Sequence, residues 1–92
     1  MAKVKLTALL ASAAAWRYEC VVRNMDRVEM FDRSSGRAAT REVRRVTKSF
    51  GPNAHGSVVL VYETRRGATK RKTIHQCSTD ERGRLSARGE EV

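Results

Sequence analysis

The sequence contains few of the residues that mark catalytic, metal-binding and disulfide-rich domains. It has one proline, two cysteines, two histidines and one tryptophan among 92 residues, and aromatic residues make up only 5% of it. With so few aromatic side chains, the core must be small and mostly aliphatic. The longest apolar stretch ends at Arg17, short of the ~20 residues that a helix needs to cross a bilayer, so no membrane partner is predicted. The length is enough for one domain and not for two.

The cysteine content argues against a disulfide framework. Cys20 and Cys77 are the only cysteines, whereas a secreted domain of this size usually carries four or more. We therefore expect two free thiols packed as small apolar side chains, and a single Cys20–Cys77 bridge in an exported domain is the alternative. A zinc site can be drawn from Cys20, His75 and Cys77, but the close paired spacings of zinc sites are missing. We predict no metal and no cofactor.

No arrangement of nucleophile, base and orienting group is recognisable, so no catalytic residue is assigned and a non-enzymatic protein is predicted. The first residues resemble an export signal, with a basic start, an apolar run over Leu6–Leu10 and the pattern Ala11-Ser12-Ala13. This segment is shorter than the usual ~15–30 residues of such signals. We expect a cytoplasmic protein, and export after cleavage near Ala13 or Ala15 is the alternative.

The sequence has an excess of basic residues over acidic ones, and most of the basic residues are arginine. Lys and Arg number 19 against 10 Asp and Glu, for a formal net charge of +9, and 14 of the 19 are Arg. The planar guanidinium of Arg holds phosphate or carboxylate with two parallel hydrogen bonds, which the compact ammonium of Lys does not. Most of the excess lies in two segments, because residues 37–50 carry a net +4 and residues 65–72 a net +5.

The first half of the chain predicts a helix followed by two strands. Ala and Leu dominate the helix, which we expect to start at about Thr7 and to end at Ala15. Apolar residues then alternate over Trp16–Arg23, and a turn at Asn24 leads into a second strand over Arg27–Asp32. Trp16 and Tyr18 are expected in the core, and base stacking is the alternative.

A second helix is predicted over Arg37–Phe50. Its apolar residues recur at helical spacing and leave the basic residues on the opposite face. Ser35 or Thr40 suits the start, and Gly51 with Pro52 ends it.

Residues 57–77 predict a β-hairpin with strands over Val58–Tyr62 and Thr69–Cys77. With Arg66-Gly67 as a two-residue loop, three cross-strand pairs are expected: Glu63 with Lys70, Tyr62 with Arg71, and Val59 with Ile74. Residues 1–80 are predicted to form one compact basic domain, and residues 81–92 a flexible polar tail.

The element order α-β-β-α-β-β predicts a small two-layer α+β domain, with two helices packed on a mostly antiparallel four-stranded sheet. A basic hairpin beside a helix with a basic outer face suits a phosphate backbone, of DNA or RNA. No motif for reading bases is present, so contacts are predicted to be mainly to the backbone. Tyr62 is the candidate for base stacking, and the candidate contact residues are Arg41, Arg44, Arg45, Lys48, Arg65, Arg66, Lys70, Arg71 and Lys72.

The same charges would also suit an acidic protein surface, as in an inhibitor or adaptor, which is the alternative function. A plain solvated surface, or an edge strand protected from aggregation by Lys and Arg, would leave the charges without a ligand. A second copy of the chain is a further candidate partner, because a domain of this size buries only about 60–65% of its unfolded surface.

Overall fold

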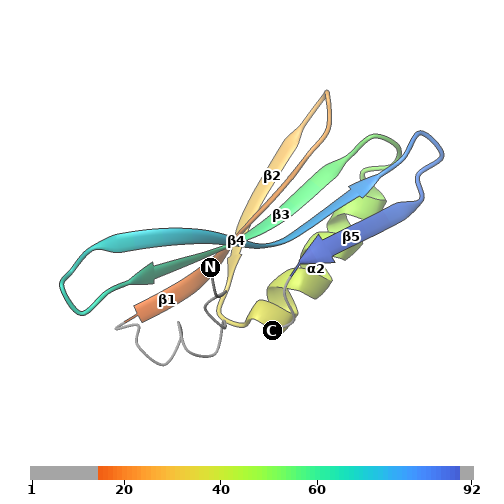
Figure 1. Cartoon of the computed structure of the whole chain (residues 1–92). Coiled ribbons are helices and arrows are strands. Elements are labelled where there is room, and N and C mark those ends of the chain that lie inside the picture. The colour runs from red at the N-terminus through yellow and green to blue at the C-terminus, as the bar shows by residue number, and fades with distance from the viewer. Residues whose placement is uncertain (1–14, 90–92) are drawn as a thin grey trace, which may run out of the picture.

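The alternating segments of the sequence form one antiparallel sheet, and a single helix of the described residues packs across one face of it (Figure 1). The structure is a computed structural model that describes residues 15–89. The strands lie in the order β2-β1-β3-β4-β5. In chain order the elements are β1 (Ala15–Arg23), β2 (Val28–Arg33), α2 (Gly36–Ser49), β3 (His55–Glu63), β4 (Thr69–Thr79) and β5 (Leu85–Gly89).

The prediction of two helices on a four-stranded sheet is wrong. The part of the chain that the structure describes forms one helix and a five-stranded sheet, and the helix expected from about Thr7 falls in residues 1–14, outside it. The fifth strand follows a tight turn in which the Asp80 carboxylate accepts hydrogen bonds from the backbone N–H groups of Arg82 and Arg84. The Asp80 N–H also donates to the Arg84 carbonyl oxygen at 3.0 Å, which starts the pairing of β4 with β5.

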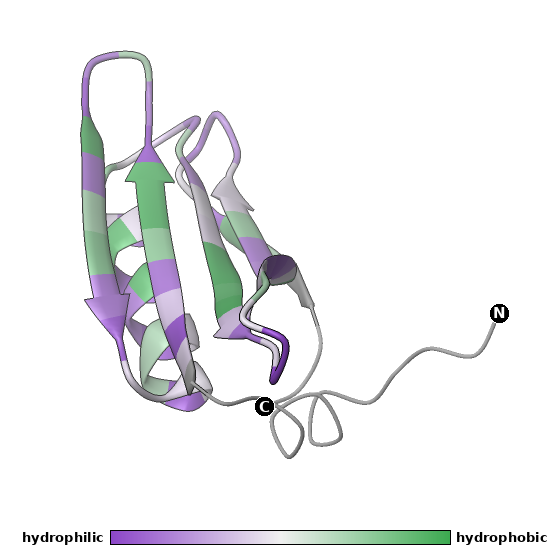
Figure 2. Cartoon of the chain, turned by 90° about the vertical axis from the view of Figure 1, so that its left-hand side faces the viewer, coloured by the Kyte–Doolittle hydropathy of each residue, from purple (hydrophilic) through white to green (hydrophobic). Residues whose placement is uncertain are grey.

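The core lies between α2 and the sheet face that it covers. Val43 of α2 is fully buried against a sheet face that includes Val22, Val58 and Leu60. Gly56 brings the β3 backbone against the helix, because a Cβ there would overlap Thr47 Oγ1 and stand 2.7 Å from Val43 Cγ1. Hydrophobic segments lie along the strands and the helix, whereas the loops between strands are largely hydrophilic (Figure 2).

The bounds of α2 agree with the sequence prediction. Ser35 is the N-cap, and its Oγ accepts a hydrogen bond from the Ala38 N–H at 3.4 Å. The helix ends at Ser49 with Phe50 as its C-cap, and Gly51 follows with a φ of +86°, a backbone conformation that favours glycine. The strands predicted over Trp16–Arg23 and Arg27–Asp32 also form, within a residue of the expected bounds.

The predicted register of the β3–β4 hairpin is wrong near its tip. Thr64 pairs with Ala68 around a three-residue loop, and a β-bulge lies between Val58 and Val59. Three cross-strand pairs therefore replace the expected ones: Tyr62 with Lys70, Glu63 with Thr69, and Val59 with Thr73. The bulge arises where Ile74 and His75 are both buried next to each other on β4.

The far half of this hairpin extends away from α2 (Figure 1). We call residues 61–71, the part of β3 and β4 that carries the loop, the arm. None of the described helical segments is long and apolar enough to cross a bilayer.

Candidate nucleic-acid interface

The apex of the arm is a short, hydrogen-bonded turn that holds two arginines at its tip. The Thr64 N–H donates to the Ala68 carbonyl at 2.8 Å and the Gly67 N–H to the Thr64 carbonyl at 2.9 Å. Gly67 has a φ of +81°, which a three-residue loop of this kind needs at its last position. Arg65 and Arg66 are exposed, and no carboxylate of the described residues forms an ion pair with either.

Two aromatic rings and an ammonium group lie in one row across the arm. Trp16 of β1 pairs with Tyr62 of β3, which pairs with Lys70 of β4. Tyr18 and Leu60, two residues from Trp16 and Tyr62, are buried in the core, and side chains two apart share a face of a sheet. The row therefore lies on the α2 side of the sheet.

The prediction that Trp16 belongs to the core is wrong, because its side chain is 47% exposed. Tyr62 is half-buried and packs against the edge of the core. Sequence alternation places both residues on the core face, but α2 does not extend over this end of the sheet (Figure 1). Lys72 lies on the same face as Lys70, one row closer to the helix, opposite Leu60.

On the opposite face of the arm, the cations have a carboxylate partner. Arg71 lies opposite Val61, so its side chain is on the far side of the sheet from Lys70. Both Arg17 and Arg71 form ion pairs with the Glu19 carboxylate. The hydrogen bond from Arg17, with a further one from Arg71, lowers the pKa of Glu19 below its ordinary value.

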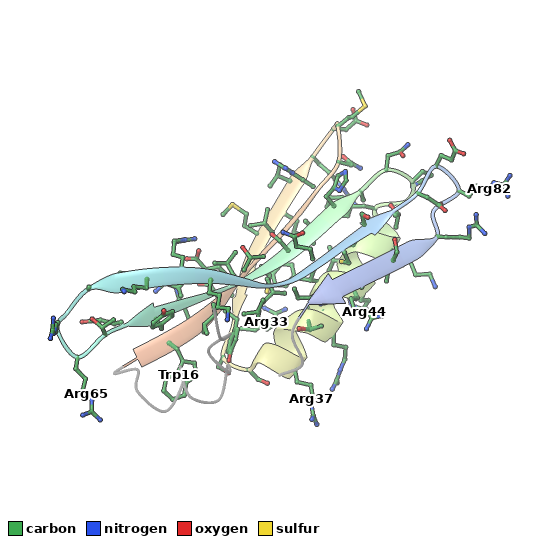
Figure 3. All side chains as sticks on the ribbon, viewed as in Figure 1. Trp16, Arg33, Arg37, Arg44, Arg65 and Arg82 are labelled. Atoms are coloured by element: carbon green, nitrogen blue, oxygen red, sulfur yellow. The ribbon has the colours of Figure 1, made fainter. Side chains whose placement is uncertain are left out.

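The outer face of α2 carries the second set of cations. Arg41, Arg44 and Lys48 are exposed, and no described carboxylate forms an ion pair with them. Arg45 is also exposed, but Glu42 pairs with it, and hydrogen bonding from Arg45 lowers the pKa of that carboxyl. Figure 3 shows Arg65, Trp16, Arg37 and Arg44 along the same lower side of the molecule, which is the α2 side of the sheet.

The nine predicted contact residues are thus divided. The α2 side holds the unpaired cations of the helix together with Lys70, and Arg65 and Arg66 stand at the tip of the arm. Arg71 faces the other way and Arg45 is paired with a carboxylate. This leaves the α2 side as the candidate interface.

The sheet face opposite α2 contains an open depression of about 700 Å³. Its polar lining can form hydrogen bonds, but it includes no carboxylate: Arg23, His55, Ser57, Gln76, Ser78 and Ser86. Across residues 15–89, no three His, Cys, Asp or Glu side chains are grouped closely enough to hold a metal ion.

The two cysteines are free and buried. Burial raises the pKa of the Cys20 thiol to about 11, so that it stays protonated at neutral pH. Cys77 Sγ donates a hydrogen bond to Thr47 Oγ1 at 3.4 Å, which joins β4 to α2. Both thiols therefore belong to the core.

Comparison of the chain with protein-family models, with curated proteins and with solved structures found no match in any of the three.

Proposed function

We propose that this protein is a non-enzymatic nucleic-acid-binding protein, which holds DNA or RNA mainly through its phosphate backbone. The observation that carries the proposal is the combination, at one end of the α2 side, of unpaired cations with partly exposed aromatic rings. Arg65, Arg66 and Lys70 have no carboxylate partner among the described residues, and Trp16 and Tyr62 lie in the same row as Lys70.

The cations supply the affinity in this proposal. Each phosphate that a Lys or Arg neutralises releases condensed counterions, so binding weakens steeply as salt is added. About five such contacts would reduce the affinity by roughly 10²–10³-fold between 50 and 200 mM salt. The arm and the outer face of α2 provide these contacts on the same side of the sheet.

The aromatic row supplies a second, sequence-independent contribution. Any of the bases can stack on an exposed aromatic ring, because each has a flat π-face. Such stacking contributes about 1–3 kcal/mol per base to the binding free energy. Trp16, with 47% of its surface exposed, is the better-placed ring, and Tyr62 is beside it on the next strand. The proposal therefore includes bases that contact the arm as well as phosphates.

The test uses Trp16 as its own probe, because it is the only tryptophan in the chain. Its fluorescence is followed while random-sequence single-stranded DNA, duplex DNA or RNA is added at low and at moderate salt. We expect quenching that salt reverses. The variant Arg65→Ala/Arg66→Ala should bind about tenfold more weakly, whereas Arg23→Ala/Arg82→Ala, which removes the same charge from exposed positions away from the arm, should change affinity far less.

An absence of quenching together with an absence of any gel shift would contradict the proposal. If the protein instead retains an acidic protein from a nuclease-treated extract, and the arm variant loses that protein, the same cations serve the alternative function of an inhibitor or adaptor.

A further inference from the structure

The exposed apolar side chains are concentrated on the β1–β2 hairpin, far from the arm. Four large apolar residues are exposed in the described part of the chain, and three of them lie on this hairpin: Met25 at 96%, Val28 at 61% and Met30 at 73%. Val28 and Met30 belong to β2, which forms one edge of the sheet. An edge strand with exposed apolar residues is a template for pairing with another strand.

The backbone of β2 has hydrogen-bonding groups available on its outer side. The Asn24 N–H donates to the Arg27 carbonyl, so this pair starts the hydrogen-bonded alternation of the β1–β2 hairpin. Counting along the register, Glu29, Phe31 and Arg33 exchange hydrogen bonds with β1. The N–H and C=O groups of Val28, Met30 and Asp32 therefore point away from the sheet, where no described strand lies.

From this edge we infer that β2 pairs in antiparallel fashion with β2 of a second copy of the chain, with Phe31 opposite Phe31 of the partner subunit. In this register, Met30 exchanges backbone hydrogen bonds with Asp32 of the partner subunit, and Asp32 with the partner's Met30. Glu29 then lies opposite Arg33 of the partner subunit, and the two-fold axis repeats this ion pair on the other side.

Charge selects this register over its neighbours. A slip of two residues in one direction, which keeps the same outward groups, would place Met30 opposite its own copy and Arg27 opposite Arg33 of the partner subunit. A slip in the other direction would place the two Asp32 side chains opposite each other. Only the register centred on Phe31 puts opposite charges across the interface.

One contact of the single chain has to be exchanged. The Arg33 guanidinium stacks on the Phe31 ring at 4.7 Å and donates to the Asp32 carbonyl at 2.7 Å. In the dimer, the N–H of the partner's Met30 donates to the Asp32 carbonyl oxygen in place of Arg33. The Arg33 side chain then turns toward Glu29 of the partner subunit. Arg33 also lies 3.9 Å from Glu42 of its own chain, so two carboxylates flank it in the pair.

The pairing joins the two sheets into one and places both α2 helices on the same side of it, because residues opposite each other on neighbouring strands share a face. The basic outer faces of the two helices would then lie on one side of the dimer. This inference does not depend on the ligand of the arm, since no residue of the arm takes part in the pairing.

Sedimentation of the full chain over a wide range of concentrations tests the inference. We expect a reversible dimer. Glu29→Arg places Arg opposite Arg twice, and Arg33→Glu places Glu opposite Glu twice, so each variant should raise the dimer dissociation constant by about tenfold or more. Glu81→Arg makes the same charge change at an exposed position in the β4–β5 turn and should leave the dimer unchanged.

Mixing the two variants gives the most specific result. A heterodimer of Glu29→Arg with Arg33→Glu has an Arg–Glu pair at both positions, so the mixture should form dimers that neither variant forms alone. Circular dichroism of each variant shows that it is folded. A chain that is monomeric at all concentrations would overturn the inference, and so would a dimer that responds to Glu29→Arg no more than to Glu81→Arg, or a mixture that stays monomeric.

Discussion

The two ends of the sheet differ in what covers the face that carries α2. Under the helix, Val22, Val58 and Leu60 are fully buried, and even one added methyl group at Gly56 has no space. At the end of the sheet that carries the arm, the same face of the same sheet holds Trp16 of β1 beside Tyr62 and Lys70, and the helix does not reach them. The strands are continuous, so the difference comes from the length of the helix.

This contrast separates stability from binding in one small domain. Buried apolar contacts hold the helix-covered half together, and these contacts tolerate little change of volume. The arm keeps its shape through backbone pairing and a hydrogen-bonded turn, so its side chains can be changed without loss of the core. We therefore expect substitutions in the two halves to affect different measurements.

The largest expected effect on stability is that of Gly56→Ala. The new Cβ would overlap Thr47 Oγ1 and approach Val43 Cγ1 to 2.7 Å and Cys77 Sγ to 3.1 Å, so the helix must shift away from β3. We expect the free energy of unfolding, measured with urea, to fall by about 2–3 kcal/mol.

Gly67→Ala is the matched substitution on the arm. No atom lies within 4 Å of its added Cβ, and only the φ of +81° opposes it. The expected loss is about 1 kcal/mol. Equal losses for the two variants would show that packing under α2 is not tighter than packing at the arm.

An intermediate effect is expected from His75, a titratable group inside the helix-covered half. Its side chain is 7% exposed, and its Nε2 has no hydrogen-bond partner among the described residues. Burial, with a smaller contribution from the charge of Arg44, lowers the pKa of His75. The folded protein therefore binds this proton less readily than the unfolded chain does.

The free energy of unfolding should consequently fall as the pH drops below about 6.5, where His75 of the unfolded chain becomes protonated. Urea unfolding at a series of pH values measures this change, and His75→Leu should remove most of it above pH 5. His55→Gln, which replaces an exposed histidine, is the control variant. A His75→Leu profile identical to that of the unmodified protein would contradict the expectation.

The helix-covered half was largely predictable from the sequence. The stripe of apolar residues that ends at Phe50, with Ser35 and Gly51 at the two ends, defines α2 because each feature has a local physical cause. Alternation likewise located β1, where Tyr18 and Cys20 are buried. These signals depend on burial of side chains, and that half of the molecule is where burial occurs.

The sequence did not predict β5 or the register of the arm, because both depend on backbone pairing that leaves no pattern of apolar side chains. β5 pairs along an edge of the sheet through residues such as the exposed Ser86, so it has no apolar alternation to find. The bulge near Ile74 shifts the register of the arm by one residue, and a shift of one residue moves side chains to the other face. The total charge of the arm was therefore predictable, but the face that presents Lys70 and the face that presents Arg71 were not.

This division of the arm makes the smallest and most specific prediction. Arg66 has no carboxylate partner among the described residues, whereas Arg71 lies on the opposite face and pairs with Glu19. Under the proposed function, Arg66→Gln should weaken nucleic-acid binding and reduce by about one the slope of log affinity against log salt. Arg71→Gln should leave that slope unchanged, although both variants remove one positive charge.

The stability of Arg71→Gln separates this interpretation from a general effect of charge. Glu19 keeps its pair with Arg17, at 2.9 Å, after Arg71 is replaced, so the free energy of unfolding should change by no more than about 0.5 kcal/mol. A loss of affinity as large for Arg71→Gln as for Arg66→Gln would show that the ligand responds to the net charge of the arm and not to the face on which a cation lies. Loss with Arg71→Gln alone would place the ligand on the sheet face opposite α2, which also holds the depression lined by His55 and Gln76.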